Sequence, residues 1–135
     1  MTDNLGFAFQ KLAFTLLRRS DEILQSKLAI GYAQYKLLEV LAEYPNSSQR
    51  FIAGELLQTE ASVSRQVKLM QQAGLLRVGI PADNKRVRVI SLSGKGSDVH
   101  ARAAMLLNQC YLRAFQNLSP SEAESLHALI KKLSI

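Results

Sequence analysis

Residues 60–96 constrain the fold more than any other part of the chain. They begin with a short helix pattern, residues 60–73, in which apolar positions repeat every three or four residues. Gly74 follows as a helix stop. Two stretches rich in Val, Ile and Leu, residues 75–80 and 86–92, then flank a turn-prone pentapeptide. This order predicts a short helix followed at once by a β-hairpin, which we call the wing.

The positive charge of the chain is concentrated in this same segment. Seven basic and two acidic residues give residues 60–96 a net charge of +5, whereas the whole 135-residue chain carries +6. Lysine and arginine on a hairpin can simply protect an edge strand from aggregation. A basic helix joined to a basic hairpin is more typical of a surface that binds nucleic acid.

Helical patterns also lie on both sides of this segment. They cover residues 5–30, a run that stops before Pro45, and residues 97–117, and a last helix starts at Ser119. Ser47 or Ser48 can cap a further helix, with Ile52, Ala53, Leu56 and Leu57 facing inward. That helix, a tight turn and the helix of residues 60–73 form a helix-turn-helix.

The predicted fold is therefore mainly α with a small β-hairpin wing. We expect one domain, residues 1–135, with a winged helix-turn-helix lobe over residues 32–96. The flanking segments, residues 1–30 and 97–135, are expected to be dimerisation helices, because residues 5–29 carry more apolar surface than one isolated helix should show.

Helix 60–73 has one apolar and one polar face. At 100° per residue, Val63, Val67 and Met70 fall together and predict the buried stripe. The opposite face and its flanks, together with the helix-cap serine and the wing, supply the predicted DNA-binding residues: Ser48, Ala61, Ser62, Ser64, Arg65, Lys68, Gln72, Lys85, Arg86 and Arg88.

Different members of this set suit different parts of a DNA duplex. Arg65 can reach guanine O6 and N7 in the major groove, and Ala61 can touch a thymine methyl group. Lys68 and Gln72 are better placed for phosphates. The basic tip of the wing can enter a minor groove, where the negative potential attracts arginine.

These residues also carry a resemblance to a known family. The matching residues are Gln34, Ile52–Leu56, Ser62–Arg65, Gly74–Leu76, Arg86 and Ser91–Gly96. Over nearly its whole length the chain resembles bacterial transcription factors of the multiple-antibiotic-resistance-regulator (MarR) type. One departure is Leu57, which stands where the helix-turn-helix bend of the family usually has glycine.

The resemblance implies a dimeric, sequence-specific regulator of transcription, and we expect a repressor. It implies homodimers built from the first and last helices, pseudo-palindromic operators in double-stranded DNA, and release by small aromatic or anionic effectors. Aromatic residues that could line an effector pocket are Phe7, Phe9, Phe14, Tyr32 and Tyr35, although aromatics at helical spacing are more often core residues.

Other functions have weaker support in the sequence. The alternative is a winged-helix module that binds a protein or antagonises another regulator, and an enzyme ranks lowest. His100 and His127 lie far apart, and the single cysteine, Cys110, is expected to be buried and inert, so we expect no metal and no cofactor. No signal peptide or membrane-spanning run is present, which predicts a cytoplasmic protein without a membrane partner.

Overall fold

The computed structural model describes residues 4–80 and 87–133. Its elements, in chain order, are α1 (Leu5–Leu28), α2 (Tyr32–Glu43), α3 (Gln49–Leu56), α4 (Glu60–Gln72), β1 (Leu76–Gly79), β2 (Val89–Leu92), α5 (Gly94–Phe115) and α6 (Pro120–Lys132). The described part of the chain is mainly helical with one antiparallel two-stranded sheet. The predicted fold class is thus confirmed.

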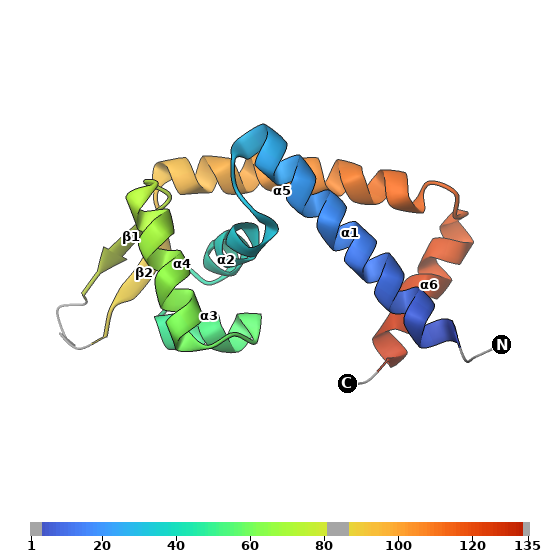
Figure 1. Ribbon diagram of the computed structural model, residues 1–135, viewed down its shortest axis with the longest axis horizontal. Coiled ribbons are helices and arrows are strands. Elements are labelled where there is room, and N and C mark those ends of the chain that lie inside the picture. Colours follow the sequence, from blue (N-terminus) through green and yellow to red (C-terminus); the bar gives the residue numbers. More distant parts are fainter. Residues whose placement is uncertain (1–3, 81–86, 134–135) are drawn as a thin grey trace.

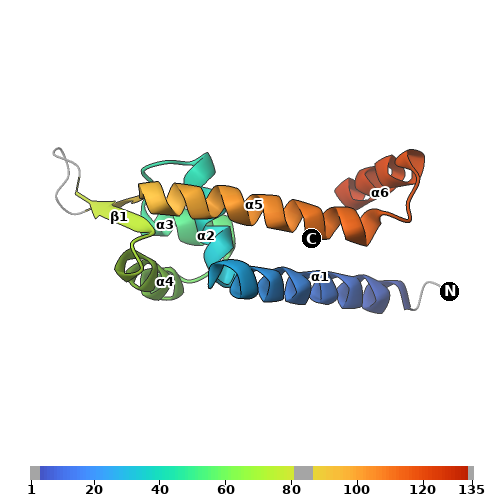
Figure 2. The same ribbon diagram turned by 90° about the horizontal axis from the view of Figure 1, so that it is seen from above.

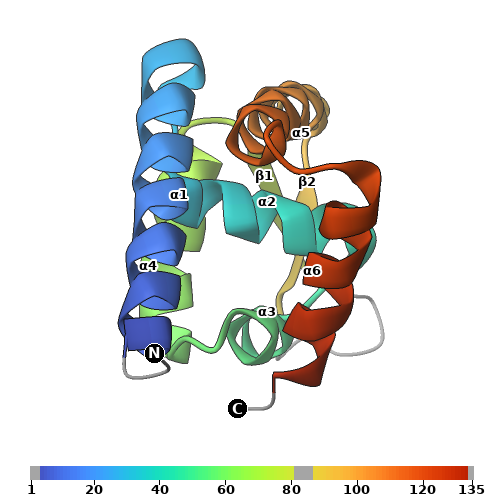
Figure 3. The same ribbon diagram turned by 90° about the vertical axis from the view of Figure 1, so that its right-hand side faces the viewer.

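The elements are arranged as a lobe and a pair of long helices (Figure 1). Helices α2, α3 and α4 and the wing gather at one end, and α6 lies at the other. Helix α5 runs from the wing to α6, and α1 lies beside it in the opposite chain direction (Figure 2). Seen from the far end, α1 and α6 stand apart on the two sides of α5 (Figure 3).

The core lies where α1, α2 and α5 meet the helix-turn-helix and the wing. Its largest fully buried side chains are Leu24, Leu37, Leu38, Leu41, Ile52, Met70, Ile90 and Leu107. The predicted stripe of α4 belongs to this core, since Val63, Val67 and Met70 are all buried. Burial of the stripe turns the polar face of α4 towards solvent.

Local capping explains where α3 and α4 begin. The Ser48 hydroxyl accepts a hydrogen bond from the Phe51 N–H at 3.1 Å, so Ser48 rather than Ser47 is the cap of α3. Thr59 caps α4 in the same way, accepting from the Ser62 N–H at 3.1 Å. The bend between them contains Leu57 in a left-handed conformation, with φ of 55°.

The position of Leu57 shows that one sequence prediction was wrong. Leu57 was expected to face inward, but its side chain is 93% exposed. The reason is the bend itself, because a left-handed residue ends the helical repeat at Leu56 and turns the next side chain outward. A non-glycine residue in this region costs about 1 kcal/mol, which is consistent with the glycine common at this position in the resembled family.

The two strands of the wing pair with each other, and β2 also pairs with Ser47, which precedes the cap of α3. Leu76 lies opposite Leu92 and Gly79 opposite Val89, so the strands are shorter than the predicted stretches. Ser47 and Ile90 exchange two backbone hydrogen bonds, of 3.0 and 2.8 Å. This bridge holds the base of the wing against the first turn of α3.

The end of α4, the wing and the start of α5 meet in a close junction. The Ser93 hydroxyl donates to the Gly74 carbonyl at 2.6 Å, and Lys95 Nζ donates to the Ala73 carbonyl at 3.0 Å. Gly96 is buried against the Leu75 backbone, and a Cβ atom there would overlap the Leu75 carbonyl oxygen. The junction therefore requires a residue without a side chain.

Replacing this glycine tests the junction. Gly96→Ala should destabilise the protein by about 1–3 kcal/mol, because backbone must move to admit the new methyl group. Urea unfolding followed by circular dichroism would measure the shift. Gly94→Ala is the matched control, since nothing lies within 4 Å of a Cβ at that position. Equal stability of the two variants would contradict the close contact.

Candidate nucleic-acid interface

The exposed side of α4 presents the predicted polar residues together. Ala61, Ser64, Arg65, Lys68 and Gln72 are exposed, whereas Ser62 is half-buried on one flank. The Ser62 hydroxyl lies 3.5 Å from Gln58 Oε1. The helix thus separates a buried stripe from a face that combines small, hydroxyl-bearing and basic side chains, as the sequence predicted.

One flank of α4 faces the wing and the first turn of α3. A hollow of about 170 Å³ lies there, and it brings Ser64 and Lys68 together with Arg88 of the wing. Its remaining lining residues are Gln49, Val67, Gln71 and Val78. Residues far apart in the sequence therefore form one continuous basic and polar surface.

A second hollow, of about 350 Å³, adjoins the first and shares Gln49 and Arg88 with it. It is bordered by Ser48 and Arg50 at the start of α3 and by Glu60 at the start of α4. The hollow places the predicted residue Ser48 beside the wing. Because the Ser48 hydroxyl already accepts the capping hydrogen bond, its position is set by the backbone of α3.

The sequence prediction missed four polar residues of this surface: Gln49, Arg50, Glu60 and Gln71. Gln71 follows Ser64 and Lys68 at the spacing of one helix flank, so periodicity could have found it. Gln49 and Arg50 directly follow the Ser48 cap, but only the packing of α3 against α4 and the wing brings them to this surface.

The other flank of α4 faces the corner between α1 and α2. Arg65 borders a hollow of about 550 Å³ there, together with Asp21 and Gln25 of α1. The Asp21 carboxylate accepts a hydrogen bond from the Tyr32 N–H at 2.9 Å, which secures this corner. Arg65 thus lies between the centre of the exposed face and a polar hollow.

Within residues 4–80 and 87–133, the basic residues of this surface form no ion pair with an acidic side chain. In the described part of the chain, the ion pairs are Arg18 with Glu22 and His100 with Glu39, both remote from the exposed face of α4. Arg65, Lys68 and Arg88 take part in neither pair. Unpaired cations on a surface favour binding of a polyanion.

Two of the predicted site residues, Lys85 and Arg86, lie outside the described residues. Within residues 4–80 and 87–133, no group of three or more His, Cys, Asp or Glu side chains is arranged to hold a metal ion. Over the same ranges, every helix is too short or too polar to cross a membrane.

Two helices joined by a tight bend and followed by a basic wing define a winged helix-turn-helix protein. A sequence model of the MarR family matches residues 30–86, which span α2, α3, α4 and β1. The HTH-type transcriptional regulator BilQ of Clostridium symbiosum is 24% identical over 120 residues, covering 89% of this chain and 81% of its own.

Two solved structures share the fold of this chain. MarR of Escherichia coli in its apo form is 22% identical, with a TM-score of 0.83 and 95% of each chain covered. MepR of S. aureus, in a complex with DNA, is 20% identical, with a TM-score of 0.83 and 94% of this chain and 93% of MepR covered. Residues 30–86 therefore match the MarR family by sequence, and the chain shares the fold of a solved MarR structure.

Proposed function

We propose that the protein is a homodimeric repressor that binds a pseudo-palindromic operator in double-stranded DNA. The observation that carries this proposal is the surface around α4, on which Lys68 and Arg88 line one hollow and Arg65 borders another. None of the three basic residues takes part in an ion pair within residues 4–80 and 87–133. Helix α4 enters the major groove and the wing lies at the minor groove. That a related protein, MepR, has been solved as a DNA complex supports the same mode.

The residues of the surface divide into base-reading and phosphate-binding groups. Arg65 reads a guanine, and Ala61 contacts a thymine methyl group. The small residues Ser62 and Ser64 let the helix backbone approach the bases. The remaining residues bind the DNA backbone or the minor groove: Ser48, Lys68, Gln72, Lys85, Arg86 and Arg88.

The terminal helices supply the dimer interface, with residues 1–30 and 97–135 as the dimerisation segments and residues 32–96 as the DNA-binding lobe. Large apolar side chains are exposed along all three helices: Leu5, Phe7, Phe9, Leu12, Phe14 and Leu17 of α1, Met105, Leu112 and Phe115 of α5, and Leu129 and Ile130 of α6. In α6 no residue is buried. Apolar surface of this extent in a single chain marks an interaction site.

A dimer explains how the operator is covered. Two copies of α4 about 34 Å apart would meet successive turns of the same side of the duplex. Each half-site then contacts one lobe, and the two-fold symmetry of the protein matches the pseudo-palindrome. A dimer bound across a promoter in this way excludes other proteins from it, which is the physical basis of repression.

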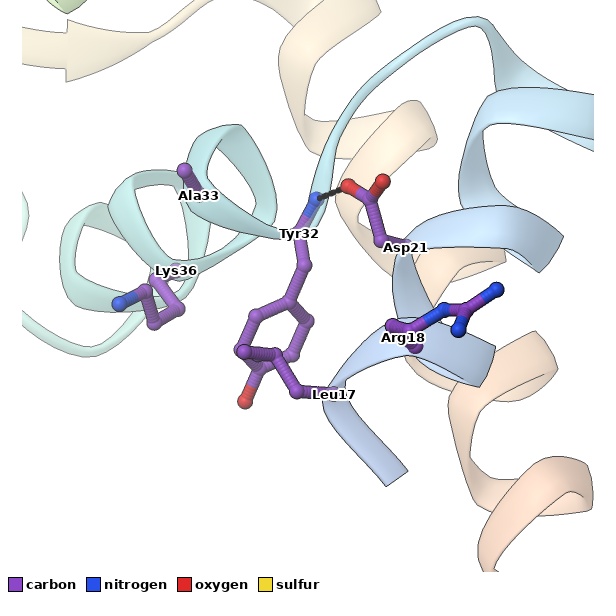
Figure 4. A pocket seen from close by; sticks show the side chains of 6 residues that line it. All are labelled: Leu17, Arg18, Asp21, Tyr32, Ala33 and Lys36. Carbon is purple, nitrogen blue, oxygen red and sulfur yellow. Dashed lines mark hydrogen bonds between the residues drawn. The ribbon is translucent and has the colours of Figure 1, made fainter. Parts of the chain in front are cut away.

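Operator binding is released by a small aromatic anion that occupies a cavity between α1 and α2 (Figure 4). The cavity has a volume of about 320 Å³ and is lined by Leu17, Arg18, Asp21, Tyr32, Ala33 and Lys36. The Tyr32 ring and Leu17 offer an apolar wall, and Lys36 lies near that ring, with its Nζ 5.8 Å from the ring centre. Lys36 supplies the positive charge for a carboxylate, whereas Arg18 is paired with Glu22.

The base-reading role predicts the effect of Arg65→Ala on DNA binding. Loss of the guanine contact should weaken operator binding by about 1–3 kcal/mol and relax the preferred base at one position per half-site. Binding titrations over a series of salt concentrations measure both affinity and the number of phosphates neutralised. Lys131→Ala, in α6, is the control, and a salt-independent affinity of the parent protein would contradict the proposal.

The interface role predicts the effect of a charge on the apolar surface. Leu12→Glu should shift the protein from dimer to monomer, because a buried carboxylate without a partner is strongly unfavourable. Sedimentation velocity gives the oligomeric state directly. Leu57→Glu places the same charge at an exposed leucine of the lobe and should leave the dimer intact. An unchanged dimer in both variants would refute this interface.

The effector role predicts that Lys36→Ala weakens binding of an aromatic carboxylate. Loss of a hydrogen bond to a charged group, worth about 1.5–3 kcal/mol, should reduce the affinity for 1-naphthoate at least tenfold. Isothermal titration calorimetry on the dimer would measure this affinity. The control is Lys11→Ala, in α1 but not among the residues that line the cavity, and it should bind 1-naphthoate as the parent does. Absence of binding to the parent protein would reject this cavity as the effector site.

A further inference from the structure

Glu60 is the first residue of α4, and its side chain lies on the flank that faces the wing. It is exposed and borders the 350 Å³ hollow, opposite Arg50 of α3 and Arg88 of the wing. Ser64 and Gln71 follow on the same flank and border the adjoining hollow. The first turn of α4 is the part that penetrates the major groove furthest in a helix-turn-helix protein.

The carboxylate of Glu60 lies within this basic surface. Among the described residues that line the two wing-side hollows, Glu60 is the one acidic side chain. Neither of the ion pairs within residues 4–80 and 87–133 includes Glu60, so it does not serve as a fixed counter-ion for Arg50 or Arg88. The negative charge of Glu60 therefore lies where DNA phosphates would approach. It weakens DNA binding unless a hydrogen bond to a base compensates for the repulsion.

Among the groups exposed in the major groove, only two can donate to a carboxylate. They are the N4 amino group of cytosine and the N6 amino group of adenine. Adenine also presents its N7 acceptor beside the amino group, and this lone pair repels a carboxylate. Cytosine presents no such acceptor at that edge. An ionised carboxylate therefore selects cytosine over the other three bases.

A favourable interaction with the helix dipole also places acidic residues in the first turn of helices, and it is worth about 0.3–1 kcal/mol. That effect does not depend on the base sequence of bound DNA. The two roles of Glu60 are thus separable by experiment, because only a contact with a base changes the sequence preference.

We propose that Glu60 is a specificity-determining residue, whose carboxylate accepts a hydrogen bond from the N4 amino group of a cytosine in each operator half-site. The inference rests on the proposed function, since it assumes that α4 occupies the major groove. It adds a base contact on the wing side of α4, separate from that of Arg65.

Selection of sites from a randomised double-stranded DNA library tests this inference. The parent protein, Glu60→Gln and the control Glu124→Gln, which removes an exposed acid from α6, are compared under the same salt conditions. The parent and the control should select a C·G pair at one position of each half-site. Glu60→Gln should relax that single position or favour adenine there, because glutamine can both donate and accept.

A base substitution in the selected operator tests the same contact through the binding affinity. Changing the cytosine to thymine replaces the N4 donor with the O4 acceptor, and it should weaken binding of the parent about tenfold or more in each half-site. The same change should affect Glu60→Gln less than threefold. Circular dichroism confirms that the variants are folded.

The outcomes distinguish the two proposals. Identical selected motifs for the parent and Glu60→Gln, or a uniform gain of affinity for all sequences, would overturn the cytosine contact and leave the proposed function intact. Relaxation at a position that is not C·G would also overturn it. A failure of the parent protein to enrich any sequence would overturn both proposals.

Discussion

The close contact between Gly96 and the Leu75 backbone is the constraint on which the rest of the structure depends. At this point the chain leaves α4, enters the wing, returns from it and begins α5. The hydrogen bonds from Ser93 to Gly74 and from Lys95 to Ala73 join the start of α5 to the end of α4. A larger residue at position 96 would separate the long helix from the lobe that it supports.

A second link joins α5 to α2, which belongs to the lobe. Glu39 Oε2 lies 2.7 Å from His100 Nε2 and accepts a hydrogen bond from the Tyr35 hydroxyl at 2.8 Å. The contact with His100 and then that with Tyr35 lower the pKa of the Glu39 carboxyl. The ionised form contributes stability above the ordinary pKa of a glutamate, and this contribution is lost as the pH falls through the lowered value.

The two ends of the molecule differ in the kind of surface they expose. Around α4 the surface is basic and polar, with small hollows between secondary-structure elements. Along α1 and α6 it is apolar, although a single chain gives these side chains nothing to pack against. Helix α5 connects the two surfaces through its contacts with α1 and α2. This arrangement suits the proposed dimer, in which each lobe is presented to DNA by a shared helical base.

The sequence by itself determined the helices, the wing and the two faces of α4, because apolar periodicity, capping residues and charge are local properties. It also predicted the exposed placement of Arg65 and Lys68. Only the tertiary structure decided which residues lie beside them. Gln49, Arg50 and Glu60 join the surface because the Ser47–Ile90 bridge fixes the wing against α3. Leu57 turns outward because of backbone geometry in the bend, which no apolar pattern records.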